Sequence, residues 1–357
     1  MFPNNVLLSQ FEEACGKEYS SPTFRGKMTK KQNEAGRNHM MFTRSQGRFA
    51  VAVSLATVAI FAAACSSGSS SSTSSTTTTA APSGPTTTLP TLVIPTQAKS
   101  AAVAALVPAK IASSGQLTEA MDATYPPDEF VSPGSSTIIG MDADLGVAIA
   151  QVMGLKPVLQ NVTFDSIIPG LQSGKYDLGN SSFTDTLARQ KVVDFADYFT
   201  AGEAFYTKAG DTTTYSSLSS LCGHSVAVET GTTEETDAHA AAKSCTKSGS
   251  KSVTVESFAT QNQVNLAVSS GRADVGFADS QVAGYVVEQS NGEFVLSGQA
   301  FNVAPYGMAA QKGNGLVQAV AAALSVLQAN GTYNQILTKW GLQSGALTPI
   351  AINSATS

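Results

Sequence analysis

Apolar residues from about position 116 onward follow two alternating patterns. In one they recur every three or four positions, as on one face of a helix, and in the other they gather in short runs typical of buried strands. The segment that begins at Asp144 has the helical pattern and ends at Gly154, where a terminating glycine belongs. The patterns predict strands at residues 116–123, 158–162, 176–179, 225–229, 252–256 and 273–278. They predict further helices at residues 164–171, 232–243, 261–269, 316–329 and 333–340.

This alternation of strand and helix predicts an α/β fold with a mainly parallel sheet. The sequence contains no G-x-S-x-G elbow, no H-E-x-x-H helix and no P-loop. It also lacks a glycine-rich dinucleotide turn after a strand, so we expect no cofactor. The chain therefore has the pattern of a protein that binds a molecule rather than one that transforms it.

A different apolar run occupies residues 49–64, ahead of the alternating segments. Arg44 and Arg48 precede this run of 16 residues, and three alanines end it directly before Cys65. The arrangement resembles a bacterial lipoprotein signal, which implies a signal peptide at residues 40–64 and lipid on the Cys65 thiol. A transmembrane anchor is the alternative, although the run is shorter than the roughly 20 residues that span a bilayer. Residues 1–39 would then be a non-structural N-terminal extension.

Composition changes abruptly after Cys65. Residues 66–91 are almost wholly Ser, Thr, Ala, Pro and Gly, a composition that cannot bury enough apolar surface to fold. We therefore expect residues 65–110 to form a disordered tether between the membrane and a folded domain. Residues 66–357 contain 13 Lys/Arg and 22 Asp/Glu, a net charge of −9, which argues against nucleic acid as a partner.

The predicted folded part contains two cysteines, Cys222 and Cys245. Outside the cell such a pair is usually oxidised, so the sequence predicts a disulfide. Metal binding is the weaker alternative, because only His224 and His239 lie nearby and their spacing is not that of a ligand set. We therefore expect no metal site.

Eight short motifs between residues 117 and 342 stand in the order of a known family. They are DATYPP (122–127), GMDADL (140–145), FDSIIPGLQSGKYD (164–177), SSFTDTLAR (181–189), VDFADYF (193–199), TGTT (230–233), GRAD (271–274) and GTYNQILTKWGL (331–342). Together they resemble the family 3 extracellular solute-binding proteins, the polar amino-acid receptors of ABC importers.

The resemblance implies a two-lobed fold of the periplasmic-binding-protein type II, with a ligand cleft between the lobes and two hinge crossings. Lobe 1 would comprise residues 111–203 and 303–345, and lobe 2 would comprise residues 204–302. Residues 346–357 would be a C-terminal tail. Hinge closure would trap the ligand, as in periplasmic binding proteins generally.

The same resemblance implies the two charged ligand contacts. Arg189 aligns with the arginine that grips the ligand α-carboxylate, and its planar fork suits that task. The alternative for Arg189 is a surface ion pair with Asp185 or Asp194. Asp279 aligns with the carboxylate that accepts hydrogen bonds from the α-ammonium, and its alternative is a strand-end or N-cap aspartate.

Four uncharged residues complete the implied site. Tyr125 aligns with the aromatic that covers the ligand side chain, although it could simply pack against its lobe. Ser182 and Thr184 align with hydroxyl and backbone donors around the ligand. Thr232 stands at a predicted helix start, where free N–H groups attract an anion, and N-capping of that helix is the alternative.

One position departs from the family pattern. An aromatic residue often follows the Tyr-Pro-Pro segment in the family, whereas Asp128, followed by Glu129, stands here. Asp128 would either face water or favour a cationic ligand side chain in the pocket.

The resemblance thus implies a lipid-anchored receptor on the extracellular face of the membrane. It would act as a monomer that captures a polar amino acid and hands it to an ABC permease with its ATPase. Two alternatives remain from the same fold. One is an enzyme like prephenate or arogenate dehydratase, with Glu229 or Glu234 as its acid, and the other is an amino-acid sensor without a transporter.

Overall fold

The computed structural model describes residues 89–356. The predicted signal peptide, the lipid site at Cys65, the extension at residues 1–39 and the first part of the tether lie outside these described residues. No helix within residues 89–356 is both long and apolar enough to cross a membrane.

Lobe 1 is an α/β unit whose first strand lies between two parallel neighbours. Strand β1 (Gln116–Met121) pairs in parallel with β5 (Lys156–Asn161) and with β6 (Leu178–Gly179). A separate antiparallel sheet lies beside them, formed by β2 (Thr124–Tyr125), β3 (Glu129–Val131) and β4 (Ile138–Ile139). The longer helices of this lobe are α3 (Met141–Met153), α4 (Phe164–Gln172), α8 (Leu316–Ala329) and α9 (Thr332–Trp340).

Lobe 2 repeats the parallel arrangement in the middle of the chain. Strand β8 (Ser225–Glu229) pairs in parallel with β9 (Thr254–Phe258) and with β10 (Val275–Asp279). Its helices are α5 (Thr233–Lys247), α6 (Gln261–Ser269) and α7 (Ser280–Gln289). The observed bounds of β8, α6 and α8 coincide with the predicted ones.

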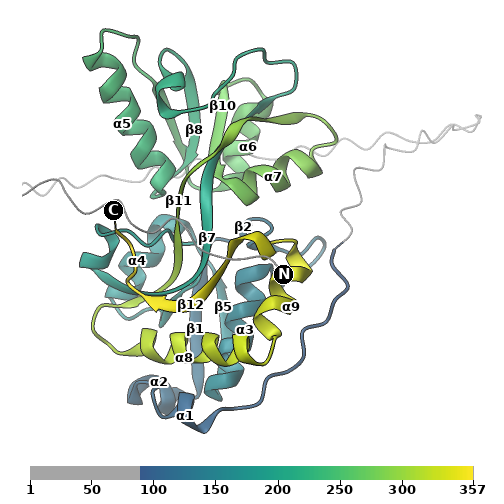
Figure 1. The fold of residues 1–357 in the computed structure, drawn as a ribbon, viewed down its shortest axis with the longest axis vertical. Helices are drawn as coiled ribbons and strands as arrows, with labels where there is room; N and C mark the ends of the chain where they lie inside the picture. The colour runs from purple at the N-terminus through teal and green to yellow at the C-terminus, as the bar shows by residue number, and fades with distance from the viewer. Residues whose placement is uncertain (1–88, 357) are drawn as a thin grey trace, which may run out of the picture. The chain divides into compact units, whose positions relative to one another are not determined.

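Two long strands join the lobes. Strands β7 (Val193–Lys208) and β11 (Phe294–Gln311) pair in antiparallel fashion, and Figure 1 shows both running from one lobe into the other. The register of β11 shifts between Ser297 and Phe301 and again between Phe301 and Ala304, where it passes between the lobes. These strands are the two crossings that the family resemblance implies. The hydrophobic pattern alone did not reveal β7, because both of its faces are buried and strict alternation is lost.

Helix α3 illustrates how local sequence sets an element of lobe 1. It ends as predicted at Gly154, which adopts the left-handed conformation (φ 75°) that favours glycine. It begins three residues earlier than expected, at Met141, because Met141 and Ala143 are buried and continue its apolar face. Its apolar side pairs with α8 in the largest buried cluster of the protein's described part.

The predicted tether is wrong at its C-terminal end. Residues before 110 form helix α1 (Ala101–Ala104), and α2 (Ala109–Ser114) follows. Val103, Val107 and Ile111 are buried in the lobe 1 core. Successive residues of these three are four positions apart, which is a helical spacing. The prediction of a disordered tether rested on composition and did not use this spacing.

The predicted C-terminal tail also needs correction. Residues 346–352 form β12 (Ala346–Ile352), which pairs with β7 at the edge of lobe 1. Beyond it, the Asn353 side chain accepts a hydrogen bond from the Phe195 N–H at 2.8 Å. The segment is therefore part of lobe 1.

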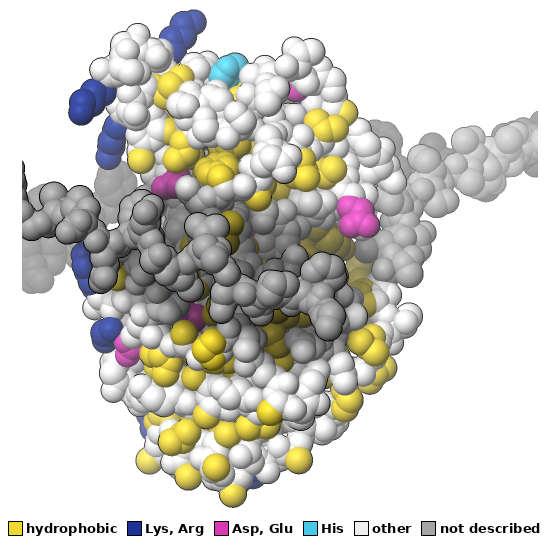
Figure 2. Space-filling view, viewed as in Figure 1, with side chains coloured by type: hydrophobic (Ala, Val, Ile, Leu, Met, Phe, Trp, Pro, Cys, Tyr) yellow, Lys and Arg dark blue, Asp and Glu magenta, His cyan; other side chains and the backbone are white. Residues whose placement is uncertain are grey.

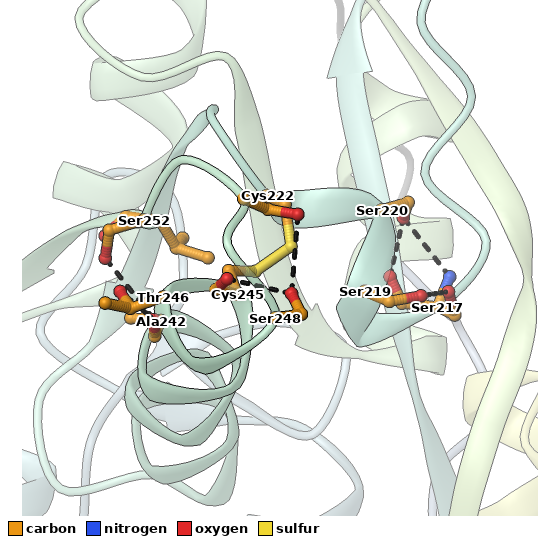
Figure 3. The surroundings of a disulfide bond; sticks show 11 residues. Ser217, Ser219, Ser220, Cys222, Ala242, Cys245, Thr246, Ser248 and Ser252 are labelled. Carbon is orange, nitrogen blue, oxygen red and sulfur yellow. Dashed lines mark hydrogen bonds between the residues drawn. A yellow bond between two sulfur atoms is a disulfide. The ribbon is translucent and has the colours of Figure 1, made fainter.

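The predicted disulfide is confirmed. Cys222 and Cys245 are bonded, with their Cα atoms 5.6 Å apart. Figure 3 shows the bond joining the residue after the short helix η2 (Leu218–Leu221) to helix α5. The disulfide stabilises lobe 2 and takes no part in the cavity described next.

Candidate ligand-binding site

A cavity lies between the lobes. Its wall is formed in lobe 1 by residues around β2 and by the segment from Ser181 to Arg189. In lobe 2 it is formed by the end of β8, the start of α5 and the end of β10. All six residues predicted to contact a ligand line this cavity: Tyr125, Ser182, Thr184, Arg189, Thr232 and Asp279.

The Arg189 guanidinium connects the two lobes. Its Nη1 donates to the Thr184 carbonyl at 2.8 Å, and its Nη2 donates to the Gly231 carbonyl of lobe 2 at 3.0 Å. The guanidinium also lies over the rings of Phe164 and Phe183, 5.5 and 5.3 Å from their centroids. Burial lowers the pKa of Arg189, but the group remains a cation because its unperturbed value is so high. The fork retains further N–H groups for a ligand carboxylate.

The alternative role of Arg189, a surface ion pair, does not describe its contacts. Asp194 instead accepts from Lys312 Nζ at 2.6 Å. Asp185 accepts from the Gln190 amide at 2.9 Å. The carboxylates near Arg189 in sequence therefore have other partners.

Asp279 and Tyr125 meet across the cavity from different lobes. Tyr125 OH donates to Asp279 Oδ2 at 2.9 Å and accepts from the Asp279 N–H at 3.0 Å. Burial raises the pKa of Asp279 to about 7, although hydrogen bonds from Tyr306 and Tyr125 counter it. Asp279 ends β10 at the N-terminus of α7, yet its side chain makes no capping bond. Its carboxylate is therefore available to the cavity.

Ser182 is held in an uncommon backbone conformation. Its φ of 49° lies in the left-handed region, which non-glycine residues seldom adopt. The Ser182 N–H donates to Asp142 Oδ2 at 2.8 Å, and the hydroxyl donates to Asp128 Oδ2 at 2.9 Å. Strained backbone of this kind is common at ligand sites, where surrounding contacts maintain it.

Asp128 and Glu129 differ in their position relative to the cavity, because only Glu129 lines it. Asp128 is fully buried, so the interpretation that it faces water is wrong, and it is not among the residues that line the cavity. Glu129 does line it, and Glu129 Oε1 accepts from the Ser181 hydroxyl at 2.6 Å. Burial raises the pKa of Asp128 to about 7.

Three threonines, Thr184, Thr232 and Thr233, lie at the N-terminus of α5. The Thr232 hydroxyl accepts from the Glu235 N–H at 3.1 Å, so this residue does cap the helix as well as line the cavity. Thr184 Oγ1 and Thr233 Oγ1 lie 3.3 Å apart across the lobes. Sequence reasoning missed Thr233, which the TGTT motif contains at the first position of the helix.

Most of the lining residues that were not predicted as ligand contacts are acidic. Five carboxylates line the cavity against one guanidinium. Among the described residues, three of these acids have a buried oxygen without a hydrogen-bond donor: Glu129 Oε2, Glu229 Oε1 and Glu234 Oε1. Burial raises the pKa values of all three well above normal. A buried carboxylate without a partner is costly, and this cost favours the protonated form of each group.

Two groups of acids can be distinguished by their neighbours. Glu234 interacts electrostatically with Asp279 and Arg189, which places it at the predicted α-amino-acid end. Glu229 interacts electrostatically mainly with Asp122 and, more weakly, with Glu234. By contrast, acidic side chains are sparse on the molecular face shown in Figure 2.

Comparison with known proteins identifies the class. The profile of the bacterial extracellular solute-binding proteins, family 3, matches residues 117–343. The arginine-binding protein ArgT of Corynebacterium glutamicum is 35% identical over 252 residues, which cover 70% of this chain and 82% of that protein. A solved structure titled as an ancestral arginine-binding protein bound to glutamine has a TM-score of 0.59 at 35% identity, covering 64% of this chain and 98% of its own. The ancestral amino-acid-binding protein AncCDT-1, described as a precursor of cyclohexadienyl dehydratase, has a TM-score of 0.58 at 32% identity, covering 65% and 97%.

The chain belongs to family 3 of the bacterial extracellular solute-binding proteins. The predicted type II two-lobed fold and the predicted class, a binding protein of a polar amino-acid ABC transporter rather than an enzyme, are confirmed. It is accordingly an extracellular or periplasmic solute-binding protein.

Replacing Arg189 by Ala tests the prediction that its guanidinium binds the ligand α-carboxylate. We expect ligand affinity to fall by about two orders of magnitude or more, because two charge-assisted hydrogen bonds are lost. Isothermal titration calorimetry with amino acids measures this. Arg272→Ala is the matched control, since Arg272 is exposed and pairs with Glu256. Unchanged affinity in Arg189→Ala would rule out this contact.

Proposed function

We propose that this protein binds a cationic amino acid, such as arginine or lysine, in the cavity between its lobes and delivers it to an ABC permease. The excess of carboxylates around the cavity carries this proposal. With one guanidinium against five acids, the wall can accommodate the single carboxylate of an amino acid and two cationic groups. A neutral or acidic side chain would leave several buried carboxylates without a counter-charge.

The two groups of acids suit the two ends of such a ligand. Arg189 would bind the α-carboxylate, and Asp279 with Glu234 would accept from the α-ammonium. Asp122, Glu129 and Glu229 would then surround the side-chain cation. Phe164 lines the same cavity and offers the face of an aromatic ring to a guanidinium or ammonium group. The binding specificity in the name of the Corynebacterium relative supports the same ligand class.

Contacts between the lobes support binding by hinge closure. Tyr125 of lobe 1 is packed in the lobe 2 cluster with Ala204 and Val264. The Arg189 bond to Gly231 and the Thr184 contact with Thr233 also cross between lobes. A ligand that bridges these groups would stabilise the closed form over the open one.

Substitution of Glu229 tests the ligand class. We expect Glu229→Gln to weaken arginine binding at least about tenfold, equivalent to about 1.4 kcal/mol, because a side-chain counter-charge is lost. Glutamine binding should change by less than about threefold. Titration calorimetry with arginine, lysine and glutamine measures the ratio, and Glu256→Gln on the surface of lobe 2 is the control. A wild-type protein that binds no cationic amino acid at 1 mM would refute the proposal.

Binding should also depend on pH. A ligand cation favours ionised carboxylates, whereas burial raises the pKa of Asp279 to about 7 and that of Glu229 well above normal. Binding therefore releases protons, and the arginine dissociation constant should fall as pH rises from about 5.5 to 8. Each proton released contributes up to about tenfold per pH unit. Calorimetry in buffers of different ionisation enthalpy counts the protons, and proton uptake on binding would contradict this charge arrangement.

Attachment to the membrane through lipid on Cys65 completes the proposed function. The support is the sequence pattern alone, because Cys65 lies outside the described residues. Cys65→Ser should move the protein from the membrane fraction to the soluble fraction after cell fractionation. A variant that stays firmly in the membrane would favour a transmembrane anchor instead.

A further inference from the structure

Asp128 has no place in the proposed ligand contacts, yet it is fully buried and hydrogen-bonded on two sides. Its Oδ2 accepts from the Ser182 hydroxyl of its own lobe at 2.9 Å. The same oxygen accepts from Gln281 Nε2 at 2.7 Å. Gln281 belongs to helix α7 of lobe 2, so this second bond joins the lobes.

The Gln281 amide makes one more contact, at the crossing strands. Its Nε2 also donates to the Tyr306 hydroxyl at 2.8 Å, and Tyr306 lies on β11 where that strand enters lobe 1. Tyr306 in turn lowers the pKa of Asp279 through a hydrogen bond. One amide group thus contacts lobe 1, the crossing strand and, through Tyr306, the neighbourhood of the predicted ammonium site.

Apolar contacts extend the same interface. Phe130 of β3 lies two residues after Asp128, and its ring centroid is 6.1 Å from that of Tyr285 on α7. The other side of Phe130 meets the Trp340 ring edge-on at 5.8 Å. Helix α7 therefore rests on the segment that carries Asp128.

We propose that Asp128 and Gln281 form a latch between the lobes, which stabilises the closed form without touching the ligand. In this role Gln281 is a positioning residue. The proposal rests on the proposed hinge closure, but not on which amino acid is bound. In the closed form Gln281 supplies a donor to a fully buried acceptor, and a buried acceptor without a donor is costly. The latch would also orient Ser182, which lines the cavity, so that closure fixes part of the ligand wall.

This interpretation gives Asp128 a role other than the one suggested by its sequence position. A residue that read the ligand side chain would line the cavity, as Glu129 does. A residue that stabilised only lobe 1 would have hydrogen-bond partners in that lobe alone, such as Ser182. The bond to Gln281 adds a partner that approaches when the lobes close.

Gln281→Leu tests the latch. Because the bond acts on the closed form, we expect affinity to fall about tenfold, with most of the change in the dissociation rate and the association rate within about threefold. The factor should be the same for arginine, lysine, glutamine or any other amino acid that the wild type binds. Stopped-flow fluorescence of Trp340, the single tryptophan of the chain, measures both rates. Gln299→Leu makes the same change at an exposed position of lobe 2 and should have no effect.

Variants at Asp128 separate the latch from general destabilisation. Asp128→Asn keeps an acceptor of the same shape and should remain within about threefold of the wild type. Asp128→Ala should match Gln281→Leu, and the double variant should lose little more than either single one. An unchanged dissociation rate, a loss that differs between ligands, or additive losses would overturn the latch.

Hydrogen exchange of the ligand-free proteins gives a readout that needs no ligand. If the latch holds the lobes together part of the time, Gln281→Leu should speed exchange in residues 124–131 and 280–289. Exchange in the lobe 1 helix α8 should stay unchanged. Equal exchange in both proteins would overturn the latch even if the proposed ligand class were wrong, so the two failures are distinguishable.

Discussion

The antiparallel pairing of β7 with β11 is the constraint on which the rest of this structure depends. These two strands belong to both lobes, and the register of β11 shifts between Ser297 and Ala304, where it passes from one lobe to the other. Backbone hydrogen bonds on either side of that point fix each strand within its lobe. The proposed hinge closure would therefore bend these strands at the crossing between the lobes.

Carboxyl groups dominate the interior of the cleft, where five line the cavity with a single guanidinium. Buried carboxylates are tolerated in proteins when they are paired, hydrogen-bonded or protonated. Here Glu229 and Glu234 each retain an oxygen without a donor among the described residues. Under the proposed function, a ligand cation would offset this cost, and proton release would accompany its binding.

The family resemblance predicted the charged ends of the site because single residues in short motifs carry them. Arg189 and Asp279 line the cavity as expected. The meeting of Asp122, Glu129 and Glu229 at the cavity was not predicted, since they come from separate segments and their spacing does not indicate contact. Asp128 shows the same limit, because its burial and its bond to Gln281 join residues that are 153 positions apart.

The sequence by itself determined the α/β class, most helices and lobe 2 strands, the disulfide and the family. Each depends on local periodicity, on a cysteine pair or on ordered motifs, all of which are properties of neighbouring residues. Only the tertiary structure decided the course of β7, the packing of Val103 and Ile111 on lobe 1, and the strand at residues 346–352. It also decided which acids face the cavity. These features arise from contacts between segments that are distant in the sequence. Burial of both faces of a strand such as β7 removes its alternating pattern. The acids that line the cavity come from separate segments, so only the fold shows which of them meet.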